Sequence, residues 1–571
     1  MDKKRFTKLV PKSLALFCVW GSAAFAGTVA PDVPALPSGT AVEMLVQYSG
    51  PVPASACGPA IATNIALCTL TSAAAATLAQ TAGVTHISVN HMLKGTAESV
   101  TPVYDYLPES LFVNPLLNAL AGIPDFLAGQ GIGVAVIDSG ISNSSADLIG
   151  LASFGNGSVG NGQSRIAYAK SFVPTEGVDD LYGHGTHVAG IIAGNGANST
   201  GPNFLHDIHG VAPGVSLISL KVLDQNGQST DAEVIQAIEW AIANQAAYNI
   251  KIINLSIGRG IYESYQLDPL CQEVEKAWLA RITVVVAAGN GGHYAPTNGY
   301  FTIGAPANDP LVITVGAFNT RSTANRSGDI VTSYSSKGPS FFDHVVKPDI
   351  VAPGNKIFSI LNPQGTLEAN YPGNVVPLAS YVRNPSPGMA SQYFMLSGTS
   401  MSAAAASGAI AWLLTSPGNQ NLNPDQVKAR LMVTASKFPR EEVTVTDSST
   451  GVNYNEFYDL FTVGAGYLDI DGAVNSNATL PSNLYFASPI AVATGTNRNG
   501  SLMLQITSKS TVWGDSVVWG DSVVWGDSVV WGDSVVWGDS VVWGDSVVWG
   551  DSTVWGDSTV WGDVELQGDP T

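Results

Sequence analysis

The sequence predicts an α/β protein whose core is a mostly parallel sheet with helices on both faces. Runs of apolar, largely β-branched residues recur between residues 133 and 317, and helix-length segments lie between several of them. Hydrophobic residues make up 45% of the 571 residues and charged residues only 12%. This composition suits a large buried core and argues against disorder. Continuous apolar strands that alternate with helices are typical of a parallel sheet buried on both sides.

Residues 1–26 resemble an export signal. Several Lys and Arg residues precede a short apolar stretch, and Ala24-Phe25-Ala26 supplies the small-x-small pattern of a cleavage site. The apolar stretch is shorter than the ~20 residues that span a membrane, so an uncleaved anchor is the weaker interpretation. We expect an exported protein, extracellular or periplasmic, with no transmembrane anchor.

Residues 27–105 are expected to form a small α+β module with a strand, a helix and a second strand. These elements are expected over 41–48, 72–83 and 85–91. Cys57 and Cys68 lie close together in the module and could pair in an oxidising compartment. Cys271 is expected to be a buried small hydrophobe, because no catalytic-thiol motif surrounds it.

Residues 106–475 are expected to carry the α/β core. The predicted strands are 133–138, 216–223, 250–258, 281–289 and 310–317. A helix is expected over 231–247, where apolar residues recur at helical spacing. Two more are expected over 400–414 and 423–435, the second with Asn423 as N-cap and Pro424 at its first helical position.

The chain ends in a hexapeptide repeat, residues 511–571, after a polar linker at 476–510. Trp recurs every six residues from Trp513 to Trp561 in the pattern V-V-W-G-D-S. A flat strand of this pattern would have no cleanly apolar face, so we expect a stacked β-coil with turns at Gly-Asp-Ser. The Trp residues could stack on sugars or a cell-envelope polymer, and the Asp residues could bind calcium. An array expanded by duplication, with no specific ligand, is the open alternative.

The formal net charge of −20 arises more from the C-terminal tail than from the core. More than half of it comes from acidic residues after Lys509, where the chain has no Lys or Arg. An acidic balance disfavours nucleic acid as a partner, because counterion-release binding needs a basic surface.

Three motifs place reactive side chains at the end of a strand or the start of a helix. Asp138 ends the run VAVID, His184 lies between two glycines in GHGTHVAG, and Ser400 follows Gly-Thr before an Ala-rich helix. Carboxyl ends of parallel strands form the sites of α/β proteins, and a helix N-terminus favours developing negative charge. Singly, each residue has a structural alternative: a turn cap, a packed histidine and an N-cap serine. Their order Asp, His, Ser matches a known arrangement of orienting acid, base and nucleophile.

These motifs resemble those of the subtilisin-like serine peptidases, the subtilase or S8 family. The resemblance covers about residues 110 to 475 and extends to INLSIG, VVVAAGN and KPDIVAPG. It implies a subtilisin-like fold and a secreted serine endopeptidase of broad protein specificity. Ser400 would attack the peptide carbonyl, His184 would carry the proton and Asp138 would orient the imidazole.

The resemblance also implies a binding site for the substrate. Asn290 would donate to the oxyanion, and Ser256, Ile257 and Gly258 would lie on the strand that pairs with the substrate backbone. The His in GHGTHVAG predicts activity at neutral to alkaline pH and argues against a related acid peptidase. One departure is Ala404, where the family usually has Pro. It leaves catalytic efficiency open.

The resemblance gives the N-terminal module a role as an inhibitory propeptide, a partner of the catalytic region until it is cut off near residues 95–115. We expect that no cofactor is required. Calcium is common in the family as a structural ion, but no Asp-rich loop assigns residues to it. His206 and His209 lack an evident third ligand, so we assign no metal site. The competing function is a weak or inactive scaffold whose Trp repeat binds a carbohydrate or envelope ligand.

Overall fold

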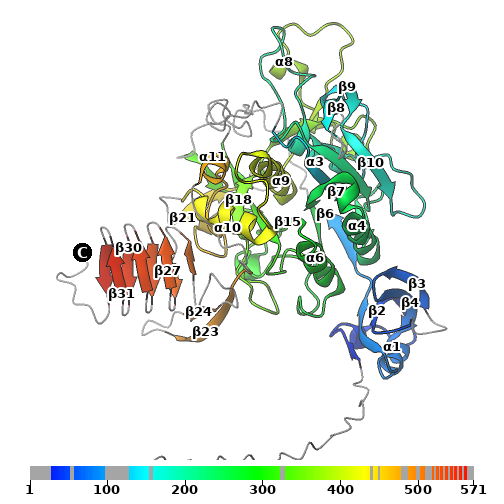
Figure 1. Ribbon diagram of the computed structural model, residues 1–571, viewed down its shortest axis with the longest axis vertical. Coiled ribbons are helices and arrows are strands. Elements are labelled where there is room, and N and C mark those ends of the chain that lie inside the picture. The colour runs from blue at the N-terminus through cyan, green and yellow to red at the C-terminus, as the bar shows by residue number, and fades with distance from the viewer. Residues whose placement is uncertain are drawn as a thin grey trace, which may run out of the picture.

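The structure is a computed structural model with three parts (Figure 1). A small N-terminal module comes first along the chain, then a large sheet domain, then a C-terminal repeat. Besides short strands of the repeat, the residues that it describes are 27–51, 57–96, 128–153, 159–321, 328–437, 442–447, 451–476, 487–496 and 502–507. The expected export signal lies outside the described residues. None of the helices among them is long and apolar enough to cross a bilayer.

The large domain is built on one sheet of eight strands. In spatial order they are β10 (Ile166–Ser171), β11 (Ser216–Lys221), β7 (Gly133–Asp138), β13 (Ile250–Leu255), β15 (Thr283–Ala287), β16 (Ile313–Asn319) and β17 (Ile330–Val331), with β18 (Ile350–Pro353) also paired to β16. All pairs are parallel except β16 with β17. The prediction of a mostly parallel sheet is therefore confirmed.

Two pairs of helices pack against this sheet. One pair is α3 (His184–Ala193) and α9 (Thr399–Thr415), and the other is α4 (Asp231–Ala243) and α6 (Pro269–Leu279). A capping box of Thr230 and Glu233 begins α4, which ends at Ala243, earlier than expected, because the chain leaves the helical conformation at Asn244.

Shorter elements complete the large domain. The helices are α5 (Gln245–Tyr248), α7 (Thr366–Asn370), α8 (Leu378–Tyr381), α10 (Pro424–Thr434) and α11 (Ile470–Asn475). The strand pairs are β8 (Ile149–Ser153) with β9 (Val159–Ser164), β19 (Ile357–Ile360) with β20 (Tyr393–Leu396), β21 (Glu442–Thr446) with β22 (Asn453–Phe457), and β23 (Ile490–Thr496) with β24 (Leu502–Thr507). Asn423 caps α10 and Pro424 begins it, as predicted.

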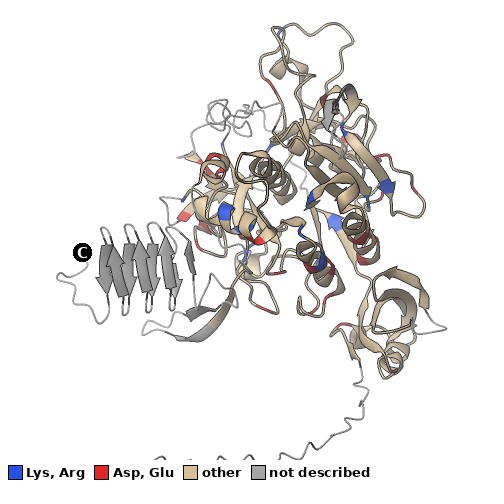
Figure 2. Ribbon diagram, in the orientation of Figure 1, with Lys and Arg blue, Asp and Glu red and all other residues tan. Residues whose placement is uncertain are grey.

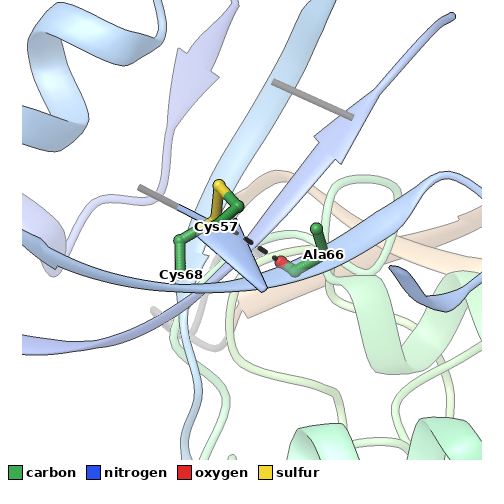
Figure 3. The surroundings of a disulfide bond; sticks show 3 residues. All are labelled: Cys57, Ala66 and Cys68. Carbon is green, nitrogen blue, oxygen red and sulfur yellow. Dashed lines mark hydrogen bonds between the residues drawn. A yellow bond between two sulfur atoms is a disulfide. The ribbon is translucent and has the colours of Figure 1, made fainter. Parts of the chain in front are cut away.

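The N-terminal module has its own sheet and its own small core. The strand order is β1 (Thr28–Val29), β5 (Val84–Val89), β2 (Ala41–Tyr48), β4 (Ile65–Thr71) and β3 (Cys57–Ala62), with α1 (Ser72–Leu78) beside them. The sequence did not predict the hairpin of β3 and β4. Cys57 and Cys68 join its two strands by a disulfide, drawn in Figure 3.

The module packs against the surface formed by α4 and α6. Leu45 and Ile65 of the module are buried in the same hydrophobic cluster as the large domain. Thr63 Oγ1 donates to Glu239 of α4 at 2.6 Å, and Gln47 donates to Gln272 of α6 at 2.9 Å. The module is therefore docked on the large domain and not held by the chain alone.

After the module, the chain enters the large domain as strand β6 (Met92–Gly95). It lies between β12 (Gln228–Thr230) and β14 (Ile257–Gly258) and is antiparallel to both. Figure 1 shows this blue strand running from the module into the large domain. The segment expected to pair with a substrate, 256–258, thus pairs with a strand of the chain itself.

The hexapeptide repeat forms two four-stranded parallel sheets, and consecutive copies alternate between them. One sheet has the order β25 (Val517–Trp519), β27 (Ser528–Trp531), β29 (Ser540–Trp543) and β31 (Ser552–Trp555); the other has β26 (Val523–Trp525), β28 (Ser534–Trp537), β30 (Ser546–Trp549) and β32 (Ser558–Trp561). In each sheet Trp is in register with Trp of the next strand.

Candidate active site

Asp138 and His184 are brought into contact at the carboxyl edge of the large sheet. Asp138 is the last residue of β7, and His184 is the first residue of α3. The two carboxylate oxygens of Asp138 lie 2.8 and 3.0 Å from Nδ1 of His184, and both side chains are fully buried. A carboxylate at this nitrogen favours the tautomer with the proton on Nδ1 and leaves Nε2 as the basic atom.

The two positions beside His184 need glycine for two different steric reasons. Gly183, the N-cap of α3, has φ +105°, a left-handed conformation that favours glycine. A Cβ on Gly185 would lie 2.2 Å from the carbonyl oxygen of Gly140 and 3.2 Å from Cβ of Asp138. Only glycine therefore lets α3 approach the end of β7 closely enough for the contact between Asp138 and His184.

A second buried carboxylate, Asp180, accepts hydrogen bonds both from Ser139, which follows β7, and from the start of α3. Its oxygens accept from the backbone N–H of Gly183 at 2.7 Å, from the backbone and hydroxyl of Thr186 at 2.9 and 2.6 Å, and from the hydroxyl of Ser139 at 2.8 Å. The Ser139 hydroxyl accepts from Gly185 N–H at 2.8 Å, and Ser139 N–H donates to Asp138. Burial raises the pKa of Asp180 above its ordinary value, although these donors lower it.

Ser400 lies in the first turn of α9, whose N-cap is Gly398. The alternative of Ser400 as the N-cap is therefore wrong. The Ser256 hydroxyl donates to the carbonyl oxygen of Ser400 at 3.0 Å, and the Ser400 hydroxyl donates to the carbonyl oxygen of Ser256 at 3.1 Å. These two bonds hold the start of α9 against the segment between β13 and β14.

Asn290 lies three residues after the end of β15 and contacts the residue before Ser400. Its carbonyl Oδ1 accepts from the backbone and the hydroxyl of Thr399, both at 3.0 Å. Its amide Nδ2 points to the chain segment that follows β6 and donates to the carbonyl oxygen of Thr96 at 2.8 Å. The amide is thus fixed at one end and directed at a peptide carbonyl at the other.

Thr96 completes the strand that runs through the site. Its N–H donates to the carbonyl oxygen of Ser256 at 3.1 Å, which continues the antiparallel pairing of Gly95 with Ile257 and of Lys94 with Gly258. Gly95 lies over the imidazole, because a Cβ there would be 3.7 Å from Nδ1 of His184. His184, Asn290, Ser400 and the three residues assigned to substrate binding thus contact one extended segment that ends at Thr96.

A cavity of about 330 Å³ opens beside Thr96. Much of its wall is glycine, alanine and main chain from the ends of β14 and β15, and Phe301 and Phe341 also line it. Both rings are about half exposed. The cavity is large enough for a bulky apolar side chain at the position of Thr96.

Other residues singled out in the sequence take no part in this arrangement. His187 is buried, its Nε2 lies 3.0 Å from the carbonyl oxygen of Phe394, and burial lowers its pKa to about 3. Cys271 is buried as predicted, and burial raises its pKa. Across the described residues, no group of three or more His, Cys, Asp or Glu is placed to hold a metal ion, so His206 and His209 gain no third ligand.

Sequence reasoning missed two groups at the site. The first is Asp180, whose position four residues before His184 was a usable signal. The second is Thr96, for which there was no local signal, because a strand's partner in another domain leaves no pattern in its own sequence. Figure 2 shows charged residues scattered along the ribbon of the large domain, with no single large cluster of one sign in this view.

Comparison with known proteins identifies the family to which this chain is similar. The model of the subtilase family matches residues 129–466. Serine protease AprX of Bacillus subtilis (strain 168) is 36% identical over 331 residues, which cover 56% of this chain and 64% of AprX. Subtilisin DY of Bacillus licheniformis is 34% identical over 323 residues, which cover 56% of this chain and 90% of that protein.

A solved structure agrees with the fold. Fervidolysin from Fervidobacterium pennivorans, a keratinolytic enzyme related to subtilisin, superposes with a TM-score of 0.52 and covers 85% of this chain and 70% of its own. At 20% sequence identity this likeness shows the fold alone. The alignment with AprX spans less than two thirds of that relative.

Proposed function

The chain belongs to the subtilase family of serine-type peptidases, and from this premise we propose that it is an endopeptidase acting through Asp138, His184 and Ser400. The observation that carries the proposal is the contact between Asp138 and Nδ1 of His184 at 2.8 Å. Ser400, the proposed nucleophile, lies in the first turn of α9. Every group that the reaction needs is a side chain or backbone group of the chain, so the proposed chemistry requires no cofactor.

In the proposed mechanism, Nε2 of His184 takes the hydroxyl proton of Ser400 as the oxygen attacks the substrate carbonyl. Asp138 stabilises the imidazolium that forms. Asn290 donates to the oxygen of that carbonyl, where negative charge develops. His184 then gives the proton to the leaving amine, and water hydrolyses the acyl-enzyme by the same route in reverse.

Substrates are proposed to be proteins or peptides in extended conformation, bound between β12 and β14. The pairing of Lys94 and Gly95 with Gly258 and Ile257 supports this, because it shows a peptide backbone in that position. Main-chain pairing selects little by sequence, which favours broad specificity. The side chain three residues before Thr96, Leu93, is fully buried and adds an apolar preference there.

The N-terminal module is proposed to be an inhibitory propeptide that is cut after Thr96. The position of the Thr96 carbonyl, bound by Asn290 in the way proposed for a substrate, supports this assignment. Removal of the module would then begin with hydrolysis of the bond between Thr96 and Ala97. This narrows the cleavage region expected from the sequence to one bond.

Export and the role of the repeat complete the proposal. The signal-like residues 1–26 and the disulfide of the module favour an oxidising compartment outside the cytoplasm. The in-register Trp positions of the repeat favour a repetitive ligand such as a cell-envelope polymer. Co-sedimentation of the full chain with isolated cell-wall polymer, compared with a chain that ends at residue 510, tests that ligand.

Casein hydrolysis by the wild type and by Ser400→Ala tests the endopeptidase. We expect release of peptides by the processed wild type and none above background by the variant. Equal activity of the two proteins, or none from a correctly processed wild type, contradicts the proposal and favours a scaffold whose repeat is the working part.

A further inference from the structure

The side chain of Thr96, as well as its backbone, contacts the reacting groups. Its hydroxyl oxygen Oγ1 lies 2.6 Å from Oγ of Ser400, although 304 residues separate the two in the chain. At this distance the two hydroxyls share a hydrogen bond, whichever of them donates.

A third oxygen belongs to the same cluster. The carbonyl oxygen of Ser256 lies 3.1 Å from the hydroxyl of Thr96 and 3.1 Å from that of Ser400. The two hydroxyls have one proton each. One hydroxyl can donate its proton to the Ser256 carbonyl and the other to the neighbouring hydroxyl, so both hydroxyl protons are hydrogen-bonded within the cluster.

In this arrangement the nucleophile is bonded away from its base. Nε2 of His184 is buried and has no hydrogen-bond partner among the described residues. For acyl transfer the Ser400 hydroxyl has to donate to that nitrogen. Whichever oxygen accepts the Ser400 proton, that of the Ser256 carbonyl or that of the Thr96 hydroxyl, must therefore release it before it can move to His184. Where the Thr96 hydroxyl donates instead, it occupies a lone pair of the attacking oxygen.

We propose that the hydroxyl of Thr96 is a brake on self-cleavage: its hydrogen bond with Ser400 either takes the proton that His184 must receive or occupies a lone pair of the attacking oxygen. The inference rests on the proposed endopeptidase and on cleavage after Thr96. In the step that it slows, the Ser400 oxygen bonds to the Thr96 carbonyl carbon while its proton moves to His184. The bond to the Ala97 nitrogen then breaks, and that nitrogen takes the proton.

The brake also has a consequence for substrates. A threonine before the cut would place its hydroxyl where that of Thr96 lies, whereas valine has the same shape and β-branching without the hydroxyl. The enzyme is therefore expected to cut after valine faster than after threonine, at similar binding. Discrimination at this position would rest on one hydroxyl, beside a cavity that neither side chain fills.

The test compares Thr96→Val and Thr96→Ser in the full chain. Each protein is refolded from denaturant, and the fraction cut after residue 96 is followed by intact mass. We expect Thr96→Val to cut about two- to tenfold faster than wild type, the worth of one neutral hydrogen bond. Thr96→Ser keeps the hydroxyl and should stay close to wild type.

A matched control is Thr77→Val, which removes a hydroxyl from the same module, where it donates to Ala73 within α1 at 2.9 Å. It should not change the cleavage rate. A Thr96→Val rate at or below wild type, or a Thr96→Ser rate equal to that of Thr96→Val, overturns the brake.

A second measurement does not depend on how the module folds. The processed enzyme is given two peptides that differ only in Thr or Val before the cut, and a higher kcat for the Val peptide is expected. Equal kcat values contradict the brake. If the wild type is not cut after Thr96 but the Val peptide is still preferred, the assigned processing bond fails and the effect of the hydroxyl stands.

Discussion

The side-chain amide of Asn290 donates to the carbonyl oxygen of Thr96 at 2.8 Å, across 194 residues of chain. The same side chain accepts from Thr399, the residue before Ser400. One amide thus connects the start of α9 with the carbonyl proposed to be attacked.

Asn290→Ala is expected to lower the rate of self-cleavage and of peptide hydrolysis by about 10²–10³-fold, because the developing oxyanion loses a preorganised donor. This magnitude was measured on a subtilisin, a relative of this chain. Single-turnover kinetics with a chromogenic peptide measure the loss. The melting temperature serves as control, since Thr399 also loses a partner. A rate within threefold of wild type would exclude Asn290 as an oxyanion donor.

Asp180→Asn is expected to lower kcat with a smaller change in KM. Its amide NH₂ cannot accept, so some of the buried donors around it lose their partner, at about 1–3 kcal/mol each. These donors belong to the segments that carry Asp138 and His184, so their loss should displace the two side chains relative to each other. We therefore expect a shifted pH profile of kcat/KM as well as a lower melting temperature. A lower melting temperature with an unchanged pH profile and kcat would reduce Asp180 to a structural role.

Docking of the N-terminal module is expected to weaken as the pH rises. His91 is stacked on Tyr262 and lies 2.8 Å from Asp32 and 3.3 Å from Asp231, with Arg259 behind Asp231. Burial lowers the pKa of His91 and Arg259 opposes its protonation, but the hydrogen bonds to Asp231 and Asp32 outweigh both and leave the pKa raised. The stabilisation is thus full below the ordinary imidazole value of 6.5 and is lost as the pH rises through the raised one.

The measurement is the melting temperature of full-length Ser400→Ala between pH 5 and 9, with and without His91→Gln. The difference between the two proteins should be greatest at pH 5 and shrink towards pH 9. Arg259 and Asp268 are paired on the far side of Asp231 and are unchanged in both proteins, so they cancel in the comparison. A difference that does not vary with pH would show that His91 acts by packing alone.

Loss of the disulfide is expected to destabilise the module. The bond closes a short loop, because its cysteines are 11 positions apart in the chain, and chain entropy gives about 2–3 kcal/mol for such a loop. Cys57→Ser with Cys68→Ser should therefore lower the yield of correctly processed enzyme on refolding. Cys271→Ser is the matched control, because that thiol is buried in the large domain. Equal yields from the double variant and the control would contradict a role of the bond in maturation.

Local sequence patterns predicted much of the large domain. The run GVAVID coincides with β7, and the helix start at Asn423 and Pro424 coincides with α10, because burial and capping are set by adjacent residues. The hairpin of β3 and β4 was missed. Its first strand contains Gly58 and Pro59, which are poor strand formers, and the pairing with β4 outweighs that local preference.

At the site, too, features set by adjacent residues could be predicted and features set by distant pairing could not. Asp138, His184 and Ser400 each lie in a motif that can be recognised locally, and Asp138 meets His184 where β7 ends at the carboxyl edge of the sheet. The pairing of β6 with β14 joins residues more than 160 positions apart, and the hydrogen bond of Thr96 with Ser400 depends on it. No local pattern carries that information.

Covalent labelling with a fluorophosphonate probe tests the central claim most directly. Peptide mapping of the labelled, processed wild type should place one adduct on Ser400, with none in Ser400→Ala and strongly reduced labelling in His184→Ala, whose folding is checked by its melting temperature. A label on another serine, or equal labelling of a folded His184→Ala, would contradict an active site in which His184 and Asp138 activate Ser400.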